Sequence, residues 1–322
     1  MSAMKAGRIV AMVIGVVCGA AAVQAQRAQQ TAPAPAMDVL KVHGQVYLIA
    51  GPASNAVVQV GAQGVLVVDT MREQDADALL TEVRKLAVGK PIRYVVNTHA
   101  HLEHVGGNAK ISQAGTQLVG GNFGGQVQGD HAFIVAHEKV LTALSAKTGA
   151  TAALPFAGWP TDTFFQAEKD MYFNGEGIQL IYEPAAHTDG DVVVWFRGSD
   201  VIATGDVFDT TRMPEIDLKR GGHVNGVIEA LNRIVDIAIS EQFTEGGTRI
   251  VPGKGRICDE FDVVEYRDMV TIVRDRVQTM IKKGMTLDQV KAKRPAFEYE
   301  PRYGAASATA FIEAAYRNLG GR

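Results

Sequence analysis

Short apolar segments typical of strands alternate with amphipathic helical segments along most of this 322-residue chain. The apolar residues of the helical segments recur at three- and four-residue spacing. Groups of strands that alternate with helices indicate α/β layers rather than an all-β barrel. Strands are predicted at residues 46–50, 56–60, 65–69, 92–97, 171–173, 178–183, 192–196, 201–204 and 249–251, and helices at 76–86 and 224–235.

The first 25 residues are organised like a secretory signal peptide. Lys5 and Arg8 give a positive start, residues 9–17 are unbroken apolar sequence, and Val23-Gln24-Ala25 resembles a small-residue cleavage site. The apolar run is shorter than the ~20 residues that a membrane-spanning helix needs. We therefore expect residues 1–25 to be removed and the protein to be exported, to a periplasm or the medium, with no stable membrane span.

The mature chain is predicted to begin with a disordered leader, because residues 26–37 are rich in Gln, Ala and Pro. Loss of Lys5 and Arg8 moves the formal net charge from −3 to −5. A mildly acidic protein has no electrostatic footprint for nucleic acid. Only Cys258 remains after processing, so no disulfide within the chain is expected.

A histidine-rich loop follows the predicted strand 92–97 and reads Thr98-His99-Ala100-His101-Leu102-Glu103-His104-Val105-Gly106-Gly107-Asn108. In an extended segment alternate side chains point the same way, so His99 and His101 can share one cation. Neutral imidazole is the commonest protein ligand of zinc-like metals. The loop predicts a metal site, with Glu103 and His104 facing a neighbouring position; the alternative is a solvated polar loop.

The loop resembles the HxHxDH signature of the metallo-β-lactamase superfamily, with Glu103 in place of the usual Asp. Four further motifs follow the family's order along the chain. They are Val67-Val68-Asp69, Ala186-His187-Thr188-Asp189-Gly190-Asp191, Ala203-Thr204-Gly205-Asp206 and Val251-Pro252-Gly253-Lys254-Gly255. The resemblance implies a four-layer αββα sandwich over residues 38–259. Residues 260–322 are predicted to form a helical extension packed on that domain.

The same resemblance implies roles for single residues. His187 would be the third ligand of a first metal beside His99 and His101, and Asp206 the carboxylate shared with a second. His104 would also be a metal ligand, and Asp69 would support the ligands through hydrogen bonds, as metal sites require.

Two departures from the family pattern fall on the second metal. Lys254 stands where the family has His, and Glu103 stands where it has Asp. An ammonium cannot coordinate a cation and repels one nearby. We expect a site with one Zn²⁺ per chain, in which Lys254 lies among Glu103 and Asp206. The alternatives are a metal-free relative, or a deprotonated Lys254 that acts as ligand or base.

The remaining histidines and loops carry weaker predictions. His223 begins a predicted helix and is placed by the resemblance at the mouth of the pocket, as a substrate contact or substitute ligand; the alternative is placement on the surface at the helix start. His43, His131 and His137 are expected to be structural. Residues 152–165 are Pro- and aromatic-rich and predict either a lid over the substrate or an ordinary covering loop.

The predicted function is metal-dependent hydrolysis of a small-molecule amide, lactone or thioester, with β-lactams among the candidates. Metal-activated water would attack a carbonyl, with Glu103, Asp206 and Lys254 as catalytic groups. Two alternatives are an exported binding protein without turnover, and an iron-dependent redox member of the same fold, since the ligands do not strongly select zinc. Nothing in the sequence predicts an oligomeric state.

Overall fold

The computed structural model describes residues 37–120, 126–146, 152–243 and 246–321. The predicted signal peptide, and the predicted leader apart from Met37, lie outside the described residues. Among the described residues, no helix is both long and apolar enough to cross a membrane.

The first sheet has seven strands in the order β1-β2-β3-β4-β5-β8-β9. Its first four strands are antiparallel neighbours, and β4, β5, β8 and β9 run parallel. Because the parallel strands end at one edge, the segments after β4, β5 and β8 meet there. The strands are β1 (Asp38–His43), β2 (Val46–Ala50), β3 (Asn55–Gly61), β4 (Gly64–Val68), β5 (Ile92–Val96), β8 (Phe133–His137) and β9 (Asp162–Phe164).

The second sheet has five strands in the order β10-β11-β12-β13-β14. A tight hairpin turn at Asn174-Gly175 joins β10 to β11, and both residues have the positive φ that a turn of this kind requires. The strands are β10 (Glu168–Phe173), β11 (Glu176–Glu183), β12 (Asp191–Phe196), β13 (Val201–Ala203) and β14 (Arg249–Val251); a separate ribbon pairs β6 (Leu118–Gly120) with β7 (Gln126–Gln128).

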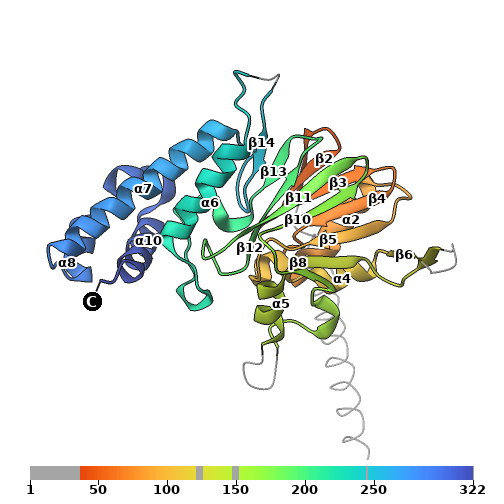
Figure 1. The fold of residues 1–322 in the computed structure, drawn as a ribbon, viewed down its shortest axis with the longest axis horizontal. Helices are drawn as coiled ribbons and strands as arrows, with labels where there is room; N and C mark the ends of the chain where they lie inside the picture. The colour runs from red at the N-terminus through yellow and green to blue at the C-terminus, as the bar shows by residue number, and fades with distance from the viewer. Residues whose placement is uncertain (1–36, 121–125, 147–151, 244–245, 322) are drawn as a thin grey trace, which may run out of the picture. The chain divides into compact units, whose positions relative to one another are not determined.

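The two sheets face each other, and helices cover their outer faces (Figure 1). One buried cluster joins residues of both sheets, such as Leu48 and Leu180. A second buried cluster packs α2 (Ala76–Leu86) and α4 (Asn108–Gln113) against the first sheet. A third packs α6 (Val224–Ile237) against the second sheet. These layers confirm the predicted αββα sandwich.

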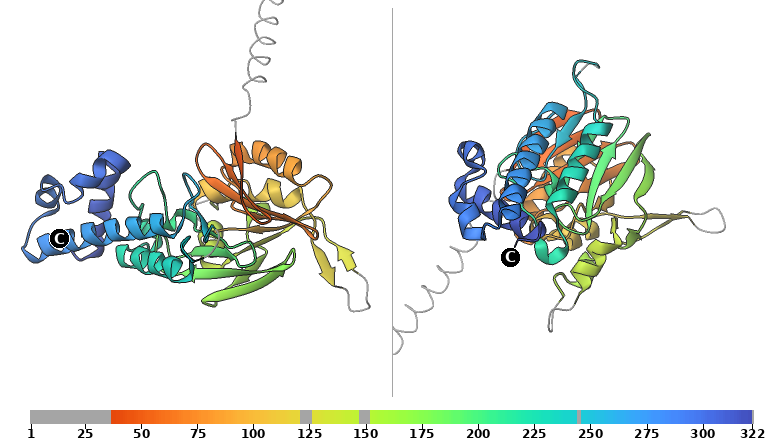
Figure 2. Two further views of the ribbon diagram at one scale, coloured as in Figure 1. Left: turned by 90° about the horizontal axis from the view of Figure 1, so that it is seen from above. Right: turned by 60° about the vertical axis from the view of Figure 1, so that its left-hand side comes forward.

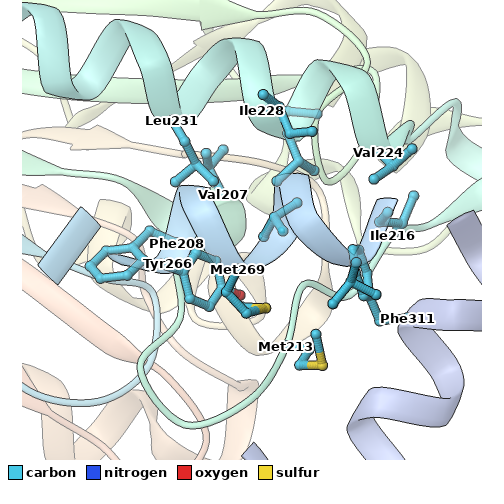
Figure 3. Packing of buried hydrophobic residues seen from close by; sticks show 14 of the residues in the cluster. Val207, Phe208, Met213, Ile216, Val224, Ile228, Leu231, Tyr266, Met269 and Phe311 are labelled. Atoms are coloured by element: carbon cyan, nitrogen blue, oxygen red, sulfur yellow. The ribbon is translucent and has the colours of Figure 1, made fainter. Parts of the chain in front are cut away.

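The C-terminal helices pack on α6, on the side away from the first sheet (Figure 2). Tyr266, Met269 and Phe311 from these helices belong to the largest buried cluster, in which Tyr266 packs against Phe208 with ring centroids 5.1 Å apart (Figure 3). Thr286 and Gln289 form a capping box at the start of α8. The helices are α7 (Glu260–Lys282), α8 (Leu287–Ala292), α9 (Glu300–Tyr303) and α10 (Ala305–Asn318).

The segment 152–165 combines the short 3-10 turn η2 (Phe156–Gly158) with strand β9. Leu154 is buried in a cluster with Ala100 and Val105 of the histidine loop, and Trp159 donates its indole N–H to the Leu154 carbonyl at 2.8 Å. The segment is therefore anchored against the histidine loop at one end and to the first sheet at the other.

One buried carboxylate makes the stability of the fold depend on pH. Glu183 ends β11 with 3% of its surface exposed, and Arg233 Nε lies 2.9 Å from its Oε1. Burial, partly opposed by Arg233, raises the pKa of this carboxyl from 4.5 to about 7. Since the folded state holds this proton more tightly than the unfolded state, the stabilisation is present below pH 4.5 and lost as the pH rises through 7.

Glu183→Gln should therefore flatten this part of the pH profile. On going from pH 5 to pH 8, the free energy of unfolding of the wild type should fall by about 1–3 kcal/mol more than that of the variant. Urea unfolding of chelator-treated proteins at both pH values measures the difference. Parallel profiles for the two proteins would show that Glu183 does not titrate in this range.

Candidate metal centre

The histidine loop leaves β5 at the edge where the parallel strands end, and α3 (Leu102–Val105) begins directly after His101. Directly after β5 ends at Val96, the side-chain amides of Asn97 and Asn108 exchange two reciprocal hydrogen bonds of 2.9 and 2.8 Å. Gly107 is needed for close approach, since a Cβ there would lie 2.3 Å from the Thr70 carbonyl oxygen. These contacts close the loop on itself and fix the positions of its histidines.

Three imidazoles converge at one point, as the sequence predicted for His99, His101 and His187. One ring nitrogen from each lies within 4.8 Å of the others, and His101 Nδ1 is 2.9 Å from His187 Nε2. His99 and His187 are buried, whereas the His101 side chain is 14% exposed. The group is therefore accessible from the His101 side.

The outer nitrogen of each of these rings has its own partner. His99 Nδ1 lies 3.0 Å from Thr98 Oγ1, His187 Nδ1 2.6 Å from the Glu215 carbonyl, and His101 Nε2 3.0 Å from Asp217 Oδ2. Such partners fix ring orientation and tautomer in metal sites. The arrangement leaves the three inner nitrogens directed at one another.

Burial keeps two of these rings neutral. It lowers the pKa of His99 well below 6.5, and nearby imidazoles lower it further. Burial also lowers the pKa of His187. A neutral imidazole has the free lone pair that coordination requires.

A second group of three, adjacent to the first, consists of His99, His104 and Asp206. His104 is fully buried between two carboxylates: its Nδ1 lies 2.8 Å from Asp69 Oδ2 and its Nε2 lies 3.0 Å from Asp206 Oδ1. Burial opposes a charge on His104, but Asp206 and Asp69 raise the pKa of the imidazole to about 10. Asp69 thus holds His104 and, through bonds of 2.9 and 2.7 Å, the Thr98 amide and hydroxyl.

Lys254 lies where the sequence placed it. Its Nζ donates to Asp206 Oδ2 at 2.5 Å and lies 3.5 Å from Glu103 Oε1. The Lys254 side chain is 12% exposed and the Asp206 side chain 3%. The ammonium and the Asp206 carboxylate therefore form a pair that is largely removed from water.

The loop that carries Lys254 is clamped by Asn55 at the start of β3. The Asn55 amide donates to the Pro252 and Gly255 carbonyls at 2.9 and 3.0 Å. At Gly253 a Cβ would lie 2.2 Å from Asp206 Oδ1, so only glycine fits. The loop approaches Asp206 this closely because its middle residue has no side chain.

Sequence reasoning missed Arg212, Asp217 and Asn55. Arg212 Nη2 lies 3.9 Å from Asp206 Oδ2, which adds a second cation beside Lys254. The carboxylates three residues before and after it, Asp209 and Glu215, were a local signal for its ion pairs. No local signal pointed from Asp217 to His101, because the two are 116 residues apart.

The remaining histidines lie outside both groups. His223 is the N-cap of α6, and its Nδ1 accepts the Asn225 amide at 3.0 Å. His137 caps α5 (Glu138–Ser145) and stacks on Tyr182 with ring centroids 3.7 Å apart.

His223→Ala tests the capping role against a ligand role. The variant should lose about 1 kcal/mol of stability, because a helix amide is left without its acceptor, and should keep its full metal content. His223→Asn, which retains a capping acceptor, should recover most of the stability. Elemental analysis and urea unfolding measure both effects, and loss of metal from His223→Ala would make His223 a ligand.

The donor set fits a divalent metal. His99 Nε2 is buried without a hydrogen-bond partner, a costly state unless a ligand meets the nitrogen. His104 Nε2 and Asp206 Oδ1 also lack an aligned hydrogen bond despite their 3.0 Å separation. The imidazoles of His99, His101 and His187, next to the Asp206 carboxylate, form a ligand set typical of zinc-like ions.

Comparison with known proteins agrees with this geometry. A family model described as the Metallo-beta-lactamase superfamily matches residues 49–245. A type 2 metallo-beta-lactamase from Bacillus cereus is 23% identical over 236 residues, which cover 71% of this chain and 78% of the relative.

Two solved structures share the fold. The metallo-beta-lactamase from Pontibacter korlensis superposes with a TM-score of 0.55 and 17% identity, covering 73% of this chain and 99% of its own. The stereoselective inverting sec-alkylsulfatase Pisa1 from Pseudomonas sp. superposes with a TM-score of 0.62 and 16% identity, covering 88% of this chain and 50% of its own. This chain therefore spans half the length of that sulfatase. Since the family match covers more than half of the 322 residues, the chain belongs to the metallo-beta-lactamase superfamily.

Proposed function

We propose that the protein is an exported zinc hydrolase with one metal ion per chain. His99, His101 and His187 would hold the ion, with Asp206 or water completing its coordination. The superfamily consists mostly of metal-dependent hydrolases, which supports the general class. Export rests on the signal-like residues 1–25.

The observation that carries the proposal is the contrast between the two neighbouring groups. In the first, three imidazole nitrogens face one another and each ring is held from behind by Thr98, Asp217 or the Glu215 carbonyl. In the second, the Lys254 ammonium lies 2.5 Å from the carboxylate that a second ion would need. The first group offers three imidazole nitrogens to a metal cation, whereas the second already contains the ammonium of Lys254.

The chain's own groups supply the rest of the chemistry. When bound, a divalent metal would act as a Lewis acid that activates water near neutral pH. The Glu103 carboxylate, whose side chain is 33% exposed, would orient the attacking water and accept its proton. Lys254 would stabilise the negative charge that develops on the substrate oxygen. Asp206 would hold Lys254 in place for this role.

The proposed substrate is a small molecule with an amide, lactone or thioester carbonyl, and the metallo-beta-lactamase relatives make a β-lactam the first candidate. The test uses mature protein purified without chelator and a panel of β-lactams, lactones, thioesters and a secondary alkyl sulfate. A carbonyl substrate should be hydrolysed, with activity lost on chelation and restored by zinc. Zinc-loaded protein without turnover on the panel would instead favour a binding protein.

A further inference from the structure

Basic side chains enclose the Asp206 carboxylate on both of its oxygens. Oδ1 lies 3.0 Å from His104 Nε2, and Oδ2 lies 2.5 Å from Lys254 Nζ and 3.9 Å from Arg212 Nη2. A second ion shared through Asp206 would therefore meet two basic side chains on the Oδ2 side. The predicted obstacle, Lys254, is only one of them.

Arg212 is fixed in its orientation. Its Nε donates to Asp209 Oδ2 at 2.8 Å and its Nη1 to Glu215 Oε2 at 2.7 Å. The Asp209 side chain is only 4% exposed, and the Tyr266 hydroxyl of α7 donates to the Arg212 carbonyl at 3.1 Å. With two guanidinium nitrogens bound in this way, the third, Nη2, is directed at Asp206.

We propose that Arg212 is a second determinant of single-metal occupancy. This inference rests on the proposed single-metal function and adds a residue to it. Lys254 and Arg212 together carry the charge of one divalent ion, and both lie beside Asp206 Oδ2. Both must therefore lose their charge before a second ion can bind.

Coulomb repulsion sets the expected size of the effect. An ion on Asp206 Oδ2 would lie a few ångströms from the guanidinium, and the Asp209 and Glu215 carboxylates offset only part of the repulsion. We expect Arg212 alone to weaken second-ion binding by at least about 100-fold. Arginine keeps its charge throughout the accessible pH range, so the barrier does not depend on pH.

The experiment counts metal ions in full mature chains. Wild type, Lys254→His, Lys254→His/Arg212→Gln and Lys254→His/Arg212→Lys are titrated with zinc by calorimetry and checked by elemental analysis after gel filtration. Wild type and Lys254→His should bind about one ion, Lys254→His/Arg212→Gln about two, and Lys254→His/Arg212→Lys about one, because lysine restores the repulsion. Arg212→Met, which keeps the aliphatic length, provides a second neutral variant if Arg212→Gln unfolds.

Arg220 is a matched control. Its side chain is 32% exposed, as is that of Arg212, and its Nε also lies 3.9 Å from an aspartate oxygen, here of Asp217. It lies beside the first group, because its Nη1 approaches the Ala100 carbonyl at 3.4 Å. Lys254→His/Arg220→Gln should therefore stay at about one ion.

The outcomes separate this inference from the function on which it rests. Two ions in wild type would refute the single-metal proposal itself. One ion in wild type and two in Lys254→His would leave that proposal intact and overturn the role of Arg212. One ion in folded Lys254→His/Arg212→Gln and Lys254→His/Arg212→Met would also overturn it. Two ions in Lys254→His/Arg220→Gln would overturn the specific role of Arg212, because removing the charge of an arginine outside the Asp206 group would then have the same effect.

Discussion

His187→Ala should yield a protein that retains no metal through gel filtration and hydrolyses none of the substrates on the panel. His187 Nε2 faces His101 Nδ1 at 2.9 Å, and the residue is fully buried, so no solvent-exposed group can replace it. Loss of one of three imidazole ligands should weaken binding well beyond the roughly 10–100-fold typical of losing an outer hydrogen-bond partner. Elemental analysis and assays with excess zinc measure the two effects.

His137→Ala is the control for this variant. His137 is also buried, with 2% of its surface exposed, but it stacks on Tyr182 outside both histidine groups. It should lose stability through lost packing and keep its metal. Full metal content in His187→Ala would make our assignment of the ligands wrong.

Asp69→Ala should be the most destabilising of the single substitutions near the site in the absence of metal. The carboxylate is 4% exposed and accepts hydrogen bonds from the Thr98 amide, the Thr98 hydroxyl and His104. Its loss therefore leaves three buried groups without their acceptor. Asp69 also has a φ of 61°, which costs alanine more than aspartate. We expect a loss of about 3–5 kcal/mol, the range for breaking a buried ion pair. Urea unfolding of chelator-treated protein removes any contribution from bound metal.

Asp69→Asn separates charge from geometry. Asparagine tolerates the same φ and retains an acceptor for the Thr98 amide, so it should lose less stability than alanine. The difference between the two variants measures the backbone and amide contributions. Equal losses would mean that the charge on Asp69 alone supports His104.

The strands of the sandwich and the residues of the metal centre were predictable from different features of the sequence. The strands of the second sheet are apolar segments separated by turns, such as Asn174-Gly175, which local chemistry defines. Glu103, Asp206 and Lys254 were predicted to meet because each belongs to a short motif in the order of a known family. The structure brings Lys254 within 3.5 Å of both carboxylates.

The misses also have physical causes. Strand β8 has only four apolar residues before His137 and leads directly into α5, and periodicity does not distinguish such a short run from buried helix. The approach of Arg212 to Asp206 depends on how Asp209 and Glu215 turn its guanidinium, which only the folded loop determines. Asp217 meets His101 through chain packing alone, because nothing near either residue in the sequence marks the pair.

The number of zinc ions that each wild-type chain holds decides whether the site is mononuclear. Mature protein purified without chelator is titrated with excess zinc by calorimetry, and its metal content is counted after gel filtration. Repulsion of about 4 kcal/mol between two unit positive charges at ~4 Å and an effective dielectric near 20 predicts about one ion per chain. Two tightly held ions would contradict the account, because the position beside Lys254 would then accept a metal.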